Sequence, residues 1–144
     1  MKRFHGHLHA EDLGKSIGVY GNLFAAEPMR VEGDRAKWML EDPCINLASS
    51  TRGSHPGIDH LGFQTDDPAE LAEMKARADS ADIALLDEGE TTGCDARSEK
   101  HWVTDPQGIA WEHVHTLGHV PVFSEGRRAT PQRPGAPRLR LRRR

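Results

Sequence analysis

The apolar positions of this chain follow a pattern that occurs twice. In each half, a short run of strand type leads to an acidic pair, and apolar residues at helical spacing follow it. These apolar positions are Leu13, Ile17, Tyr20 and Phe24 in the first half, and Leu71, Met74 and Ala78 in the second. Asp12 and Asp67 precede the two runs, where a carboxylate can cap free amides and interact well with the helix dipole. The pattern therefore predicts two helices, each preceded by a strand.

Three short strands are expected after each helix. They lie near Met29–Glu32, Ala36–Leu40 and Cys44–Ser49 in the first half, and near Ile83–Leu86, His101–Thr104 and Ile109–His115 in the second. An Asp-Pro turn precedes the last strand of each half, at Asp42-Pro43 and at Asp105-Pro106. The sequence thus predicts two modules, residues 3–49 and 57–119, joined by a polar linker. Neither module can bury its sheet alone, so we expect both to share one α+β core within a domain of residues 1–125.

The composition supports one soluble domain. Among 144 residues, 28% are charged and 36% hydrophobic, a globular balance. No apolar run approaches the ~20 residues that a membrane span needs, and the first ten residues lack the apolar core of a secretory signal. Two cysteines do not make a disulfide scaffold. We therefore expect a cytoplasmic protein with no membrane partner.

The net charge of −3 conceals an uneven distribution. All 22 acidic residues lie within residues 1–125, whereas residues 126–144 carry eight arginines and no acid. The last segment is also rich in proline and glycine, so we expect a disordered basic tail. The body is acidic, which argues against nucleic acid as its partner.

Histidines and one glutamate form the candidate chemistry. His5, His7 and His9 alternate, so a strand would project all three from one face. When HGHLHAED at residues 5–12 is laid on HLGFQTDD at residues 60–67, His60 is the repeat partner of His5. Glu112 lies in the last expected strand. Two imidazoles and one carboxylate on separate strands suit a facial triad with three open positions, which favours Fe(II) and also accepts Mn(II), Ni(II) or Zn(II).

Two further points bear on this interpretation. The first-half counterpart of Glu112 lies near Asn46, a poor metal ligand, which favours three protein ligands rather than four. A lone histidine on a strand is more often an ordinary half-buried residue than a ligand, and this alternative stays open for each histidine taken singly.

The repeated strand-helix-three-strand pattern, with His5, His60 and Glu112 on its strands, resembles the vicinal oxygen chelate superfamily. This superfamily contains glyoxalase I, extradiol dioxygenases, and bleomycin and fosfomycin resistance proteins. The segments IDHLGFQ, TTGCDARSEKHWVTDPQG and WEHV resemble its arsenic- and cadmium-induced branch, which includes organoarsenical carbon–arsenic lyases. The resemblance covers about residues 3–119. It implies a cup-shaped mixed sheet, a homodimer, and His5, His60 and Glu112 as metal ligands at the catalytic centre.

The branch typically carries two adjacent cysteines after a Thr-Thr pair, and both thiolates capture trivalent arsenic. Here Thr92 is followed by Gly93 and Cys94, so one thiol is missing. The resemblance implies that Thr92, Cys94 and Lys100 contact the substrate, and a lysine near the thiol would lower its pKa. His7 shares the face of the first expected ligand and is a further candidate for substrate contact.

Three functions compete at this point. The first is an Fe(II)-dependent enzyme of heavy-metal resistance that binds a trivalent organoarsenical through Cys94 and cleaves its carbon–arsenic bond. The second is another glyoxalase- or dioxygenase-type metalloenzyme acting on a small oxygen-chelating substrate. The third is a non-catalytic protein that sequesters a metal or drug. The sequence favours the first over the second, because the second leaves Cys94 and the Thr-Thr pair unused; the third would be favoured if metal removal left ligand binding unchanged.

Overall fold

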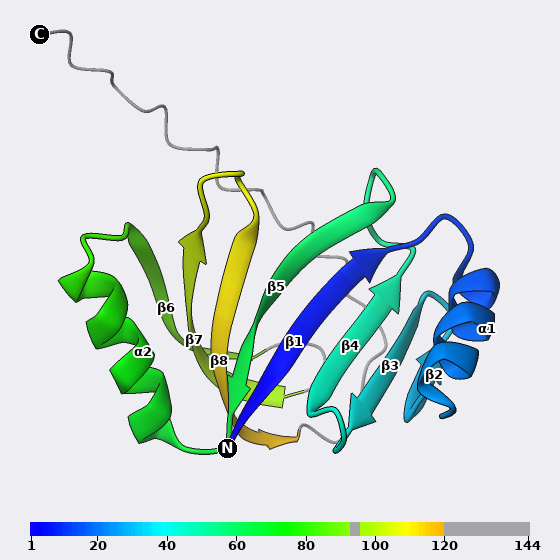
Figure 1. The fold of residues 1–144 in the computed structure, drawn as a ribbon, viewed down its shortest axis with the longest axis horizontal. Coiled ribbons are helices and arrows are strands. Elements are labelled where there is room, and N and C mark those ends of the chain that lie inside the picture. The colour runs from blue at the N-terminus through cyan, green and yellow to red at the C-terminus, as the bar shows by residue number, and fades with distance from the viewer. Residues whose placement is uncertain (93–95, 120–144) are drawn as a thin grey trace, which may run out of the picture.

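One mixed sheet dominates the structure, a computed structural model that describes residues 1–92 and 96–119 (Figure 1). The elements are β1 (Lys2–His9), α1 (Leu13–Phe24), β2 (Arg30–Glu32), β3 (Arg35–Leu40), β4 (Ile45–Ser50), β5 (Gly57–Thr65), α2 (Pro68–Ser80), β6 (Leu85–Thr92), β7 (Ala96–Thr104) and β8 (Ala110–His119). The strand order is β2-β3-β4-β1-β5-β8-β7-β6. Figure 1 shows the sheet curving between the two helices, which lie at its opposite ends. The α+β fold built from two βαβββ modules is confirmed.

The two modules are related by an approximate two-fold axis between β1 and β5. These central strands are antiparallel, and each pairs in parallel with the last strand of its own module, β4 or β8. His5 lies opposite Gly62, and His7 lies opposite His60. Since His5 and His60 are repeat partners, this crossed pairing is the register that a two-fold axis requires. The internal repeat seen in the sequence is therefore present as a structural repeat.

Both helices begin at the expected capping residues. The Asp12 carboxylate accepts a hydrogen bond from the Lys15 amide at 3.0 Å, and the Asp67 carboxylate accepts one from the Ala69 amide at 2.8 Å. Pro68 occupies the first turn of α2, where a missing amide proton costs little. The local sequence signals therefore determine where each helix starts.

Apolar contacts hold each helix to the strands of its own module. The rings of Tyr20 and Phe24 on α1 lie 5.7 and 6.2 Å from the ring of Trp38 on β3, measured between centroids. Trp38 is fully buried. On α2 the buried residues are Leu71, Met74 and Ala78, the set that the helical spacing predicts. Each helix thus covers strands of its own half of the sheet.

The ladder places the candidate ligands on the sheet face away from α1. Trp38 faces α1, pairs with Leu47, and Leu47 pairs in turn with Gly6. Residues paired in this way share a face of the sheet, so Gly6 lies on the helix side. His5 and His7, one position to either side, point to the opposite face. The helices and the candidate site therefore lie on opposite sides of β1.

The β6–β7 hairpin is longer than expected. The sequence pattern predicted strands near Ile83–Leu86 and His101–Thr104, whereas β6 and β7 extend over Leu85–Thr92 and Ala96–Thr104. In the part of the hairpin that the sequence did not predict, polar residues of β6 pair with polar residues of β7, for example Glu90 with Glu99. β6 is the edge strand of the sheet and β7 lies next to it, so the polar residues of this hairpin remain solvated and leave no apolar alternation to detect.

Part of what the sequence predicted lies outside the described residues. This holds for Gly93, for Cys94 and for the basic segment of residues 126–144. Within residues 1–92 and 96–119, neither helix has the length and apolar character that crossing a bilayer would require.

Candidate metal centre

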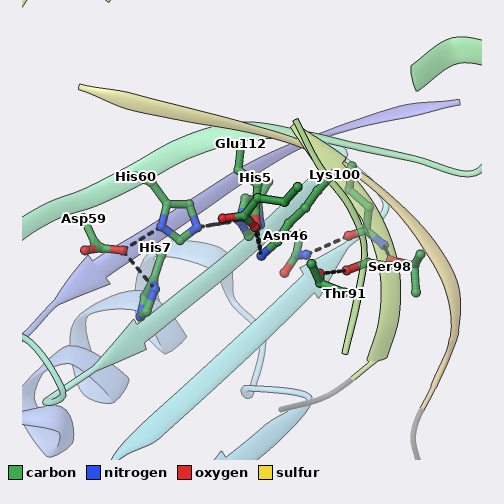
Figure 2. A network of polar contacts seen from close by, with 12 residues as sticks. His5, His7, Asn46, Asp59, His60, Thr91, Ser98, Lys100 and Glu112 are labelled. Carbon is green, nitrogen blue, oxygen red and sulfur yellow. Dashed lines mark hydrogen bonds and ion pairs between the residues drawn. The ribbon is translucent and has the colours of Figure 1, made fainter. Parts of the chain in front are cut away.

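The structure brings His5, His60 and Glu112 together on adjacent strands β1, β5 and β8 (Figure 2). The two Nε2 atoms are 2.9 Å apart, and Glu112 Oε2 lies 3.0 Å from His5 Nε2 and 3.5 Å from His60 Nε2. All three side chains are largely buried, with 11–13% of their surfaces exposed. Three ligand atoms of the type that divalent metals prefer thus face one point.

Gly62 allows these strands to approach closely. It lies opposite both His5 and Glu112 in the ladders. A Cβ added at Gly62 would lie 1.8 Å from the Glu112 carbonyl oxygen, so no other residue fits without moving β8. A side chain here would separate the carboxylate from the imidazoles.

The separations between the three atoms fit a single metal ion. Two atoms that are each about 2.1 Å from one ion lie about 3.0 Å apart at right angles and about 3.4 Å apart at the tetrahedral angle. The observed 2.9, 3.0 and 3.5 Å span these values. The set also matches a 2-His-1-carboxylate facial triad, in which other positions stay open for small ligands. The donors present can therefore hold a divalent metal of the iron or zinc type.

Asp59 orients the His60 ring for this purpose. His60 Nδ1 lies 2.6 Å from Asp59 Oδ2, so the proton on Nδ1 is donated to the carboxylate and Nε2 faces the site. Metal-binding histidines usually have such an outer partner. The hydrogen bond from His60 also lowers the pKa of Asp59 to about 2, against the opposing effect of burial. Asp59 is therefore ionised at neutral pH and keeps a proton on His60 Nδ1, so that Nε2 is the nitrogen left to bind a metal.

The three groups are strongly coupled when no metal is bound. Burial by itself would lower the pKa of His60, but its hydrogen bonds to Asp59 and Glu112 outweigh burial and raise the pKa to about 9. Burial opposes ionisation of Glu112, yet hydrogen bonds from His5 and His60 hold its pKa well below the usual range. A proton on His60 thus occupies the place that a metal would take.

This proton leads to a prediction about pH. A divalent metal must displace it, so near neutral pH binding should release about one proton per ion, and the apparent affinity should rise about tenfold per pH unit up to about pH 9. Calorimetry in buffers of different ionisation enthalpy measures the proton count. If the observed heat did not depend on the buffer, His60 would not carry a displaceable proton.

Lys100 points into the site, as expected for a substrate-contacting residue, but its partners are carboxylates. Its Nζ donates to Glu112 Oε1 at 3.1 Å and lies 3.5 Å from Glu88 Oε2. The ammonium also lies 5.4 Å from the centre of the Trp102 ring. Burial lowers the pKa of Lys100, but the charge of Glu112 outweighs it and the pKa is raised. Lys100 therefore holds one oxygen of Glu112 and leaves the other facing the imidazoles.

The other predicted substrate residues are placed unequally. His7 lies beside His60, with 5.3 Å between ring centroids, and its Nε2 is 2.8 Å from Ser50 Oγ. Thr92 ends β6, but its side chain is outside the described part of the structure, as is the whole of Cys94. The other cysteine, Cys44, lies just before β4, with its Sγ 4.0 Å from Met1 Sδ.

The pairing of β1 with β4 and of β5 with β8 shows that Asn46 is not the first-half counterpart of Glu112. Glu112 pairs with Gly62, and the repeat partner of Gly62 is His7, which pairs with Ala48. The counterpart is therefore Ala48, two residues beyond Asn46. The turns do not fix this register, because the loops before β4 and β8 differ in length and only the strand pairing sets which residues correspond. Alanine offers no ligand atom, so a set of three protein ligands still follows.

Sequence reasoning did not identify Asp59. Strict alternation turns Asp59 away from the face of His60. In the structure, His7 pairs with His60 and Leu8 pairs with Ile58, so Asp59 is the unpaired residue of a β-bulge. The bulge turns its carboxylate onto the face of the site. The only signal in the sequence is that Asp59 adjoins His60, which does not indicate a bulge.

Comparison with known proteins agrees with this architecture. Residues 5–113 match the model of the Glyoxalase/Bleomycin resistance protein/Dioxygenase superfamily. The chain is 38% identical over 119 residues to a trivalent organoarsenical cleaving enzyme of Bacillus sp. (strain MD1), covering 81% of this chain and 74% of that protein. It is 31% identical to the cadmium-induced protein CadI of Mycobacterium bovis, covering 89% and 85%.

Solved structures show the same fold. The Mn(II)-bound glyoxalase from Novosphingobium aromaticivorans superposes with a TM-score of 0.58 at 12% identity, covering 88% of this chain and 44% of that one. At such low identity the likeness concerns the fold alone.

Proposed function

The chain belongs to the glyoxalase/bleomycin resistance protein/dioxygenase superfamily, and from this we propose that it is an Fe(II)-dependent enzyme that cleaves the carbon–arsenic bond of trivalent organoarsenicals. The observation that carries the proposal is the convergence of His5, His60 and Glu112 within 2.9–3.5 Å of one another. Relatives named for organoarsenical cleavage support the choice of substrate. The proposed role in the cell is arsenic resistance.

In this proposal His5 and His60 bind the metal through Nε2, and Glu112 binds it through Oε2. Iron bound there would supply dioxygen activation beside the substrate, and Mn(II), Ni(II) or Zn(II) are alternative occupants. Glu112 Oε1 stays with Lys100, which favours a carboxylate that binds through one oxygen. That arrangement would keep the remaining positions open for small ligands.

The chain's own residues would bind and orient the substrate. Cys94 is proposed to capture trivalent arsenic, because a thiolate is the softest ligand that the chain offers. In the sequence it lies two residues after Thr92 and six before Lys100, the other two residues that the resemblance assigns to substrate contact. Thr92, Lys100 and His7 are proposed to contact the rest of the substrate. Capture by one thiolate lacks the chelate advantage of a pair.

Gly93 favours a second candidate function. Where the arsenic branch has a second cysteine, this chain has glycine, which weakens the case for arsenic. The alternative is a glyoxalase- or dioxygenase-type reaction on a small oxygen-chelating substrate at the same metal. A protein that only sequesters a metal or drug is the third possibility, and it would bind its ligand without turnover.

One experiment separates the three. Protein purified without oxygen and loaded with Fe(II) is mixed with methyl or aromatic trivalent arsenicals, and the released inorganic arsenite is measured together with oxygen uptake. We expect arsenite release that requires both iron and oxygen. Binding without release would favour sequestration, and neither binding nor release would favour the oxygen-chelating substrate.

We also propose that the protein is a homodimer. Large apolar side chains are exposed on α1 and on the short edge strand β2: Val19 and Leu23 are 61% and 69% exposed, and Val31 is 55% exposed. Val19 and Leu23 are four residues apart and so share one face of α1, and exposed apolar side chains on one face favour contact with another surface. Light scattering should give the mass of two chains, and the mass of one chain would contradict the proposal.

A further inference from the structure

A chain of hydrogen bonds leads from the end of β1 to the candidate metal centre, and the Asp59 carboxylate lies in its middle. Asp59 Oδ2 accepts a hydrogen bond from His60 Nδ1 at 2.6 Å, and Asp59 Oδ1 lies 2.9 Å from His9 Nε2. Figure 2 shows Asp59 on the side of the His60 ring away from Glu112. One carboxylate therefore joins His60 to His9, a residue that the proposed reaction does not use.

The Asp59 carboxylate needs a contact at its second oxygen to stay in position. Its side chain is 33% exposed, and it is the unpaired residue of the β-bulge, so the backbone ladder does not fix its direction. Without a contact at Oδ1, the carboxylate can turn toward water and leave His60 Nδ1 without an acceptor. His7 does not supply that contact: its Nδ1 lies 3.6 Å from Asp59 Oδ2, too far for a hydrogen bond, and its Nε2 is 2.8 Å from Ser50 Oγ. His9 supplies the hydrogen bond at Oδ1.

The His9 ring is itself held in place. Gly53, in the linker between the modules, packs against it, since a Cβ at Gly53 would lie 2.1 Å from His9 Cδ2. His9 Nδ1 is buried and has no hydrogen-bond partner among residues 1–92 and 96–119. Placing the proton on Nε2 avoids a buried N–H without an acceptor, and it makes His9 the donor to Asp59.

We infer that His9 is a positioning residue of the metal centre, which acts through Asp59 on His60. The hydrogen bond from His9 keeps Asp59 Oδ2 on His60 Nδ1, and Asp59 in turn keeps His60 Nε2 directed at the site. Outer contacts of this type orient a ligand ring and raise its basicity. The inference rests on the proposed metal site, and it adds the end of β1 and the linker to the parts of the chain that support this site.

The test compares the Zn²⁺ affinity of full-length variants, measured at one pH by competition with a chromogenic chelator. His9→Phe keeps a ring of similar size but removes the donor, so its affinity should fall by about 3–10-fold, less than the roughly 10–100-fold that loss of the outer partner itself costs. His9→Gln restores a donor near the position of Nε2 and should stay within about twofold of the wild type. His55→Ala replaces an exposed linker histidine and should leave the affinity unchanged, as the matched control.

A second comparison shows whether His9 acts through Asp59. Asp59→Ala should weaken Zn²⁺ binding by about 10–100-fold. Adding His9→Phe to Asp59→Ala should cause no further loss, because the group through which His9 acts is already gone. Circular dichroism and the unfolding midpoint show which variants are folded, and His9→Leu, which also lacks a donor, replaces His9→Phe if the latter does not fold.

A purely structural contact gives a different result. It would lower the unfolding midpoint of metal-free His9→Phe but leave the Zn²⁺ affinity of the folded protein unchanged. Wild-type affinity in folded His9→Phe, equal losses in His9→Phe and His9→Gln, or losses that multiply in the double variant overturn the proposal. A wild type that binds no Zn²⁺ would instead refute the metal site itself, so the two failures are distinguishable.

Discussion

His60→Ala should remove the metal from the His5–His60–Glu112 site and reduce organoarsenical turnover to background. The substitution leaves two ligands, His5 and Glu112, and it also removes the hydrogen bond that His60 makes with Asp59. Loss of an outer partner alone typically costs 10–100-fold in metal affinity, so loss of a ligand should cost at least about 100-fold. Metal analysis after Fe(II) loading should show one ion fewer per chain than the wild type.

His55→Ala is the matched control, since it removes an exposed imidazole outside the set of His5, His60 and Glu112. It should keep the metal content and turnover of the wild type. Circular dichroism and the unfolding midpoint of metal-free protein show whether His60→Ala remains folded. A folded His60→Ala protein with undiminished metal would refute the assignment of His5, His60 and Glu112 as the ligands.

Cys94→Ser should abolish carbon–arsenic cleavage while leaving the metal in place. Serine keeps the size and polarity of the side chain but removes the soft sulfur that trivalent arsenic prefers. With one thiol in the sequence where the branch has two, no neighbouring cysteine can take over, and we expect turnover to fall by at least about 100-fold. Arsenite release and bound iron are measured on the same preparation.

Cys44→Ser provides the comparison. This thiol contacts Met1 just before the start of β4 and is partly exposed. Substitution of a partly exposed residue away from a site has a small effect, so turnover should stay within about twofold of the wild type. Turnover retained in Cys94→Ser would contradict arsenic capture by this thiol. If the wild type cleaved none of the trivalent arsenicals, the glyoxalase- or dioxygenase-type alternative would replace the proposal.

Local signals account for the parts of the fold that the sequence determined. Asp12 and Asp67 cap helices through contacts within three residues, and a helical stripe depends only on spacing along the chain. The repeat that relates His5 to His60 is visible because both modules keep the same order of elements. His5, His60 and Glu112 could be selected together because these residues lie on strands that the repeat predicts, and because their chemistry forms a known ligand set.

The tertiary structure decided what depends on pairing between distant strands. The bulge opposite His7 and Leu8 turns Asp59 toward His60, and no pattern within β5 encodes an unpaired residue. Register also identified Ala48, rather than Asn46, as the counterpart of Glu112. A shift of one residue turns a strand side chain to the other face, so side-chain direction is known only once the partner strand is in place.

The three residues of the site could be predicted from the sequence, whereas the contacts that support them depend on strand pairing. The sequence alone determined that two imidazoles and a carboxylate would lie on three strands of one repeated fold. Only the folded sheet decided that Lys100 holds one oxygen of Glu112, and that Asp59 gathers His7 and His9 beside the His60 ring. The contacts of Asp59 join β1 to β5, which are far apart in the chain, and the contact of Lys100 joins β7 to β8. They exist because the sheet brings those strands within hydrogen-bond distance.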